Sequence, residues 1–128
     1  MIRTIGEILP HAARRYGDKP ALAIGSKRFT FNELEALSNA LANGLIGAAV
    51  EPGDHVALYG PNSWEWLAAY YAIAKTGAVV IPINVMLTPE EVGYIVRDSG
   101  TKAIIAAPDK GAPLLDIRGK GSLSHVVL

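Results

Sequence analysis

The twenty residues Ala72–Glu91 restrict the fold of this chain more than any other stretch, because they predict a helix end, a buried strand and a helix start in succession. Lys75 and Gly77 predict the end of a helix, since a cation is favourable at the negative end of the helix dipole and glycine adopts the positive φ that closes a helix. Ala78–Ile83 is apolar apart from its proline and has no polar alternation, which predicts a strand covered on both faces. Thr88–Glu91 then predicts a capping box with proline at the first helical position.

The same alternation of helices and strands continues through the rest of the chain. We expect helices at 4–16, 30–46, 62–75 and 88–99, strands at 21–24, 27–29, 55–59, 78–83, 101–107 and 123–128, and a loop or broken short helix at 108–121. Gly25-Ser26 predicts a two-residue hairpin turn, because glycine accepts positive φ. Strands that alternate with helices predict the α/β class, with a mainly parallel sheet and helices on both of its faces.

Three helices have apolar residues at helical spacing, which predicts one buried stripe on each. The stripes are Ile5, Ile8, Leu9 and Ala12; Leu34, Leu37, Leu41 and Leu45; and Trp66, Ala69, Tyr70 and Ile73. The first two helices each begin with a predicted capping box, at Thr4–Glu7 and at Thr30–Glu33.

The 128 residues are enough for one domain with one core. The 12 Lys and Arg residues balance 12 Asp and Glu residues, so the formal charge predicts no nucleic-acid partner and no attraction to anionic lipid. The absence of cysteine excludes a disulfide framework and favours a cytoplasmic protein. The longest uncharged run, Ala36–Val50, is too short for a transmembrane segment, which needs about 20 apolar residues.

Several motifs, in order, resemble the adenylate-forming (AMP-binding) superfamily. Lys75–Asn84 is similar to its lysine-x-glycine-alanine-x-x-x-proline-x-asparagine or aspartate motif, and Phe29–Leu34 to its threonine-tyrosine-x-glutamate-leucine motif, with Phe31 where tyrosine is more usual. Three further segments, Ser38–Leu45, Pro52–Leu58 and Pro61–Ser63, resemble the fatty-acid CoA ligase branch. The resemblance spans about 5–128.

The resemblance implies the N-terminal subdomain of an acyl-CoA synthetase. Such a parent enzyme activates a carboxylic acid, here a fatty acid, with ATP and Mg²⁺ to an acyl-adenylate and transfers the acyl group to coenzyme A. The family's serine-, threonine- and glycine-rich phosphate loop does not occur in 1–128, and neither does its C-terminal domain, so we expect an inactive fragment whose partner is the remainder of its own chain. The alternatives are a binding or scaffold domain that has lost catalysis, and another branch such as an aryl-CoA ligase or an adenylation domain.

We predict no catalytic, cofactor-binding or metal-binding residue within the chain. Arg118–Ser122 lacks the earlier glycine of a phosphate loop, since Leu114 stands there, and it is predicted to be a surface loop. The three histidines, His11, His55 and His125, lack the spacing of a metal site, and the latter two are predicted at strand edges.

The remaining candidates also have structural explanations that we favour. Ser99 is predicted at a helix end, and Lys75 at a helix C-terminus rather than on an acyl phosphate. Asn62 and Asn84 follow apolar strands, where parallel sheets build ligand crevices, yet asparagine is also a common turn residue. Trp64 and Trp66 are predicted on opposite sides of a helix, one in the core and the other at a domain interface.

Half of the residues are hydrophobic, which is a high share for a small domain. We therefore expect an exposed apolar surface that the missing remainder would cover, and self-association, in its simplest form a homodimer, when it does not. The strand edge at Val126-Val127 is a second predicted route to self-association.

Overall fold

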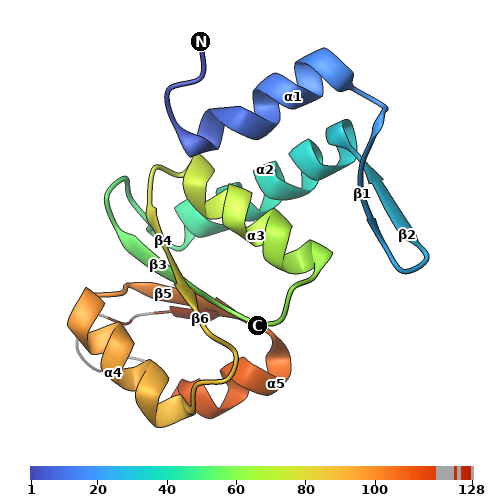
Figure 1. Ribbon diagram of the computed structural model, residues 1–128. Helices are drawn as coiled ribbons and strands as arrows, with labels where there is room; N and C mark the ends of the chain where they lie inside the picture. The colour runs from blue at the N-terminus through green and yellow to red at the C-terminus, as the bar shows by residue number, and fades with distance from the viewer. Residues whose placement is uncertain (118–122, 124, 128) are drawn as a thin grey trace.

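Helices and strands alternate along the chain, as the sequence predicts (Figure 1). The computed structural model describes residues 1–117, 123 and 125–127. Its elements are η1 (Ile5–Glu7), α1 (Ile8–Tyr16), β1 (Pro20–Ile24), β2 (Lys27–Thr30), α2 (Phe31–Gly47), β3 (His55–Tyr59), α3 (Trp64–Lys75), β4 (Val79–Ile83), α4 (Pro89–Ser99), β5 (Ala103–Ala106), α5 (Pro108–Gly111), η2 (Ala112–Ile117) and β6 (His125–Val127). The predicted broken helix after β5 is confirmed as far as Ile117, whereas the Arg118–Ser122 loop lies outside the described residues.

Four parallel strands form the central sheet in the order β4-β3-β5-β6. Val56 is in register with Val80 on one side and with Ala103 on the other. Helices α2 and α3 lie on one face of this sheet, and α4 and α5 lie on the other (Figure 1). The predicted parallel sheet with helices on both faces is therefore confirmed.

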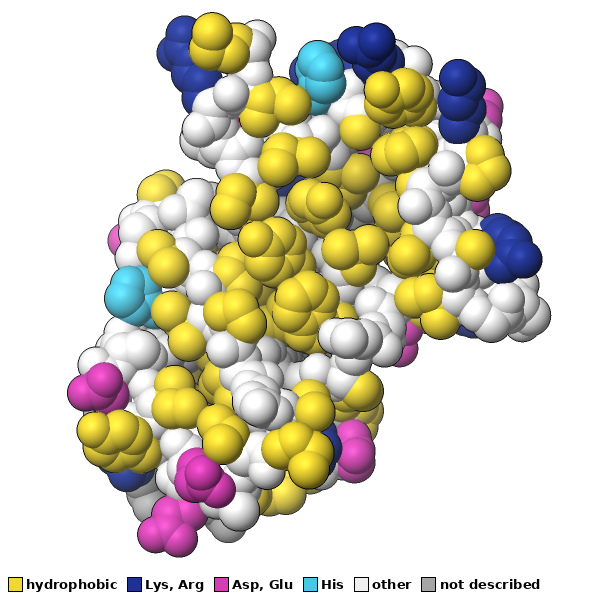
Figure 2. Space-filling model, viewed as in Figure 1, with side chains coloured by type: hydrophobic (Ala, Val, Ile, Leu, Met, Phe, Trp, Pro, Cys, Tyr) yellow, Lys and Arg dark blue, Asp and Glu magenta, His cyan; other side chains and the backbone are white. Residues whose placement is uncertain are grey.

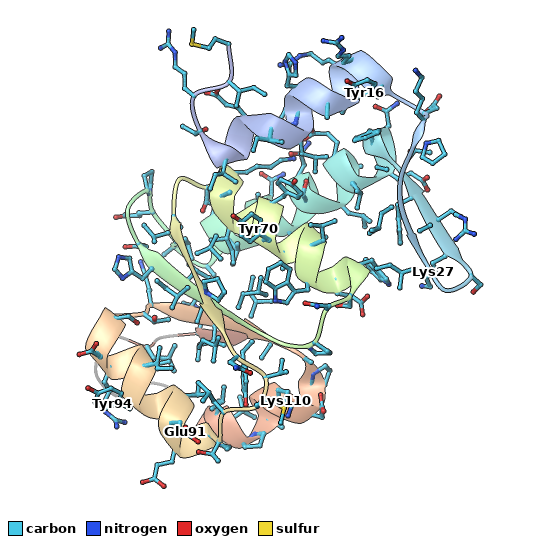
Figure 3. The ribbon with its side chains drawn as sticks, in the orientation of Figure 1. Tyr16, Lys27, Tyr70, Glu91, Tyr94 and Lys110 are labelled. Atoms are coloured by element: carbon cyan, nitrogen blue, oxygen red, sulfur yellow. The ribbon has the colours of Figure 1, made fainter. Side chains whose placement is uncertain are left out.

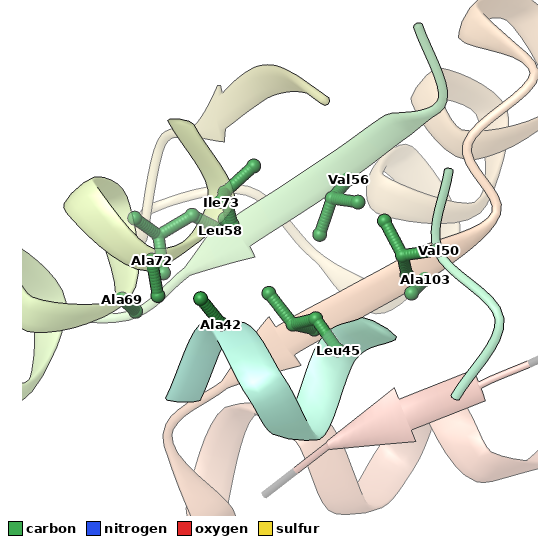
Figure 4. Close-up of a cluster of buried hydrophobic side chains, with 9 residues drawn as sticks. All are labelled: Ala42, Leu45, Val50, Val56, Leu58, Ala69, Ala72, Ile73 and Ala103. Carbon is green, nitrogen blue, oxygen red and sulfur yellow. The ribbon is translucent and has the colours of Figure 1, made fainter. Parts of the chain in front are cut away.

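Each face of the sheet has its own hydrophobic core. Alternate residues of β3 point to opposite faces, so Val56 and Leu58 join α2 and α3, whereas Ala57 and Tyr59 join α4. The first core contains Ala42, Leu45, Val50, Val56, Leu58, Ala69, Ala72, Ile73 and Ala103 (Figure 4). The second contains Ala57, Tyr59, Ile83, Val92, Val96, Ile104, Ala106, Leu114 and Leu123.

Strands β1 and β2 form a separate antiparallel hairpin beside α2. Its turn passes through Gly25, whose φ is +59°, as predicted. Phe29 of β2 packs against Trp64 at the start of α3, with ring centroids 5.2 Å apart. This contact fixes the hairpin against the helical layer.

The Ala78–Ile83 strand is covered on both faces, as predicted, but only in part: Val80 packs against the first core, and Ile81 and the buried Ile83 pack against the second. Strand β4 lies at an edge of the described sheet, and Val79 is 45% exposed. Pro82 lies within it, and proline, which cannot donate to a ladder, is characteristic of edge strands. An apolar run thus did not distinguish an edge strand from a central one.

The predicted capping box at Thr4 does not form. The Thr4 side chain makes no cap hydrogen bond, and the carboxylate of Glu7 accepts from the Arg3 N–H at 2.7 Å. The reason is tertiary: Gly6 packs so tightly on the end of α3 that a Cβ there would lie 2.8 Å from the carbonyl oxygen of Ala74. Of the four residues predicted to form the buried stripe, Leu9 alone is buried, while Ile5 and Ile8 are 48% and 39% exposed.

The buried stripe of α2 agrees with the prediction at Leu34 and Leu45 and is displaced by a fraction of a turn between them. Its buried residues are Leu34, Ser38, Ala42 and Leu45. The predicted stripe residues Leu37 and Leu41 instead lie at one side, where they line a cavity. The small residues Ser38 and Ala42 face α3, which presents Ala69 and Ala72, so the two helices pack closely.

Candidate functional site

A cavity of about 510 Å³ opens at the carboxyl ends of β3 and β5, between α2 and the start of α3. In open parallel sheets this edge is where ligands bind, and the volume is typical of small-molecule sites. Its lining is Leu37, Leu41, Leu58, Tyr59, Gly60, Pro61, Ser63, Trp64, Glu65, Trp66, Ala69, Ile105, Ala106, Ala107 and Pro108. Glu65 is the one lining residue that carries a formal charge, so the cavity is mainly apolar.

Two short loops, one after β3 and one after β5, contribute to the lining of the cavity. The Ala107 N–H donates to the carbonyl oxygen of Tyr59 at 3.1 Å, which joins the loop after β5 to the end of β3. Ser63 then begins α3 as its N-cap, with its hydroxyl accepting from the Trp66 N–H at 3.1 Å. The cap fixes the first turn of α3 and therefore the positions of the two tryptophans in that turn.

The tryptophans form an aromatic wall over α3. Trp64 lies between the cavity and the hairpin, with the ammonium of Lys27 5.2 Å from its ring centroid. Trp66 packs on the first core and stacks on Tyr70, with ring centroids 5.6 Å apart. Figure 2 shows hydrophobic side chains gathered over α3 and the strands beside it. The sequence predicted opposite roles for the two tryptophans, whereas the structure places both at the cavity.

Tyr59 connects the cavity to the opposite face of the sheet. Its hydroxyl donates to the carbonyl oxygen of Leu87 at 2.6 Å and so fixes the loop between β4 and α4. Burial raises the pKa of this phenol above 10.0, and the negative charges of Asp109 and Glu91 add to the rise. Tyr59 is therefore a neutral hydrogen-bond donor at physiological pH.

The two asparagines considered in the sequence lie outside the lining of the cavity. Asn84 follows β4, and its side-chain oxygen accepts from the Met86 N–H at 2.9 Å, which is the turn role that the sequence favoured. Asn62 lies exposed in the loop between β3 and α3, just before the N-cap. The structure does not bring the two side chains together into a site.

The histidines and Ser99 are also dispersed. His11 is exposed on α1, while His55 and His125 begin β3 and β6, as predicted. The Nδ1 atom of His55 lies 2.5 Å from the carbonyl oxygen of Ser99, and the Ser99 hydroxyl pairs with Thr101 at 2.6 Å. Across the described residues no group of three or more His, Cys, Asp or Glu side chains is placed to hold a metal ion.

Lys75 ends α3, as predicted, but its side chain turns toward α2 rather than toward the cavity. Its ammonium donates to the Ser38 hydroxyl and to the Asn39 side chain. These cross-helix contacts, which helix-dipole reasoning alone did not predict, give the lysine a structural role.

The cavity can bury an apolar group, but its lining provides few side chains that could act as catalytic groups on that group. Sequence reasoning missed the cavity because Leu37 and Leu41 were assigned to the core of α2. The small residues Ser38 and Ala42 are the sequence signal that could have revealed the cavity. They indicate that a face of α2 other than the one with Leu37 and Leu41 makes the close contact with a neighbouring helix.

Known proteins with the same fold define the family of this chain. The family model of AMP-binding enzymes matches residues 9–128, so the chain belongs to that family. The long-chain-fatty-acid–CoA ligase of Salmonella typhimurium is 35% identical over 127 residues, which are 98% of this chain and 23% of the ligase. These findings confirm the resemblance that the motifs indicate.

Two solved structures have the same fold along nearly the whole chain. Mycobacterium tuberculosis fatty acyl CoA synthetase superimposes with a TM-score of 0.87 at 34% identity, covering 97% of this chain and 26% of the synthetase. The anthranilate CoA ligase AuaEII, solved in complex with anthranoyl-AMP, gives 0.88 at 31% identity, covering 98% of this chain and 25% of the ligase. The chain therefore spans about a quarter of the relatives that it matches.

Proposed function

We propose that this chain is the N-terminal part of an acyl-CoA synthetase whose substrate is a carboxylic acid, specifically a fatty acid. The parent enzyme activates the acid with ATP and Mg²⁺ and transfers the acyl group to coenzyme A. The observation that carries the proposal is the family match over residues 9–128, together with the 35% identity to a long-chain-fatty-acid–CoA ligase. Within the parent, 1–128 is an N-terminal subdomain that contributes sheet, helices and one apolar wall, and the phosphate loop and the C-terminal domain come from other parts of the enzyme.

Pyrophosphate release tests this proposal. The chain alone should release none with ATP, Mg²⁺ and any carboxylic acid, because its sequence lacks the family's phosphate loop. A longer product of the same gene that includes that loop should release pyrophosphate and form acyl-CoA. Steady, metal-dependent turnover by the 128-residue chain, after a contaminant control, would contradict the proposal of an inactive subdomain.

Two other functions are distinguished by the same assay. A panel of fatty and aryl acids separates the fatty-acid branch from an aryl-CoA ligase, which the similarity to the anthranilate CoA ligase favours as second candidate. A binding or scaffold domain would show no turnover in any longer product. The reading frame downstream of Leu128 is a simpler discriminator, since the scaffold function requires no phosphate loop there.

We also propose that the apolar cavity is covered by other parts of the parent chain and, in the isolated chain, by a second copy. The half-buried aromatic wall at Trp66, which lines the open cavity, and the position of β6 at the end of the described sheet support self-association. Light scattering over a dilution series tests this, and a monomer at every concentration would contradict it. A cytoplasmic location is part of the proposal and is supported by the absence of cysteine. None of the helices in the described part of the chain is long and apolar enough to cross a membrane.

A further inference from the structure

The rim of the apolar cavity carries a single negative charge. Glu65, the second residue of α3, is exposed and is the one charged side chain in the lining. In the part of the chain that the structure describes, its carboxylate forms no ion pair. A carboxylate in the first turn of a helix is favourable to the helix itself, so a role at the cavity needs further evidence.

Negative charge at this edge of the sheet extends beyond the lining. Tyr59 lines the cavity, and the negative charges of Asp109 and Glu91 add to the rise in the pKa of its hydroxyl. Lys27 on the hairpin and Lys110 on α5 are not among the residues that line the cavity (Figure 3). A cation that enters the cavity is therefore attracted, whereas an anion is repelled.

The other polar groups of the lining are already engaged. The hydroxyl of Tyr59 donates to a backbone carbonyl oxygen, and that of Ser63 accepts from a backbone N–H. The remaining surface is aliphatic and aromatic, and the ammonium of Lys27 lies 5.2 Å from the ring centroid of Trp64, so this ring already interacts with a cation. The lining thus suits an apolar stem that ends in a positive charge.

We propose that the cavity holds the side chain of a lysine or arginine from the remainder of the parent chain, with its aliphatic stem against Leu41 and the two tryptophans and its charged head at Glu65. Both side chains combine such a stem with a cationic head. The inference rests on the proposed function, in which other parts of the parent cover the cavity, and adds the chemistry of the residue that does so. A carboxylate in the same position would be repelled by Glu65.

Three small molecules of equal length, hexylamine, hexanol and hexanoate, test the proposal on the 128-residue chain without ATP. Both tryptophans of the chain line the cavity, so a blue shift of tryptophan emission reports that it is filled. Hexylamine should bind roughly fivefold more tightly than hexanol, and hexanoate more weakly than either, with the differences reduced by salt. Glu65→Gln should remove the preference for the amine, and Leu41→Ser should weaken binding of all three molecules.

Two matched control variants lie outside the cavity. Glu90 is the second residue of α4, as Glu65 is of α3, so Glu90→Gln removes the same interaction with a helix dipole and should leave the order of the three affinities unchanged. Ile46→Ser removes an exposed aliphatic side chain from α2 and should leave all three affinities unchanged. Thermal melts establish that every variant is folded.

A longer product of the same gene separates this inference from the proposed function. Its cavity is filled by its own chain, so hexylamine binding that depends on Glu65 should be lost. Pyrophosphate release with that binding retained overturns this inference alone, whereas loss of the binding without pyrophosphate release contradicts the synthetase function alone. The inference is also overturned if hexanoate binds the 128-residue chain as tightly as hexylamine, or if Glu90→Gln changes the order of affinities as much as Glu65→Gln.

Discussion

The ammonium of Lys75, at the end of α3, forms an ion pair with the carboxylate of Glu35 on α2. The same ammonium donates to the Ser38 hydroxyl at 2.6 Å and to the Asn39 side chain at 2.8 Å, while its side chain is only 9% exposed. A buried cation is tolerated only when such partners replace water. The network fixes the end of α3 against the middle of α2.

Lys75→Met should lower the free energy of unfolding by about 3 kcal/mol, because it leaves the carboxylate of Glu35 partly buried without its partner. Chemical denaturation measures the change. Lys75→Met combined with Glu35→Leu should recover most of the loss, since an apolar pair needs no partner. Additive losses in the double variant would show that the two side chains act independently.

Gly77→Val should destabilise the chain by roughly 1 to 2 kcal/mol through backbone strain alone, because Gly77 has a φ of +81° just after α3. The positive φ that the sequence predicts here is confirmed. A Cβ at this position would also lie 3.1 Å from the Cβ of Pro52, which adds crowding. Gly25→Val is the control, since Gly25 has positive φ but no atom within 4 Å of such a Cβ. Equal shifts of the melting temperature in the two variants would exclude a contribution from Pro52.

Ala49→Gly should raise the free energy of unfolding by about 0.5–1 kcal/mol, because Ala49 has a φ of +67°, a conformation that glycine adopts without strain. The Ala49 N–H donates to Ile46 O at 3.0 Å and the Val50 N–H to Leu45 O at 3.0 Å, which is the Schellman pattern that normally ends in glycine. Ala48→Gly is the control and should destabilise, since Ala48 has a φ of −87°. Thermal melts of both variants give the sign directly.

Asp54→Asn should lower stability at neutral pH, and the difference from the native chain should shrink in acid. The Glu51 N–H, which donates to the carboxylate at 2.7 Å, is the main cause that holds the pKa of Asp54 below 3.8, and Lys102 at 3.2 Å adds to it. A lowered pKa in the folded state stabilises the fold fully above 3.8, and this stabilisation is lost as pH falls through the folded value. A difference in unfolding midpoint that stays constant from neutral pH to well below 3.8 would contradict this assignment.

Local signals in the sequence predicted the ends of the helices well. The capping boxes at Thr30 and Thr88 form as expected, and Gly77 and Gly100 have positive φ after α3 and α4. These features depend on a few neighbouring residues and their backbone geometry. The box predicted at Thr4 failed because a tertiary contact of Gly6 with α3 determines the geometry there.

Burial was predicted less well, because it depends on neighbours that are distant in sequence. An apolar strand of the same composition can be central or, as with β4, at an edge. The cavity was missed for the same reason, since Leu41, Pro61 and Pro108 come from three separate segments and share no motif. The dispersal of the histidines was predicted, because their spacing already excluded a shared helical face.

The close packing of α2 on α3 through methyl-sized side chains has a consequence for how such proteins diverge. Ala42 and Ala72 determine how near the two helices come, while Leu41 and Trp66 on the same helices line the cavity. An added methyl or ethyl group at Ala42 would move the helices apart and with them the walls of the cavity. Over evolutionary time, a chain of this kind can therefore change the shape of what it accommodates through substitutions at positions that never contact the occupant.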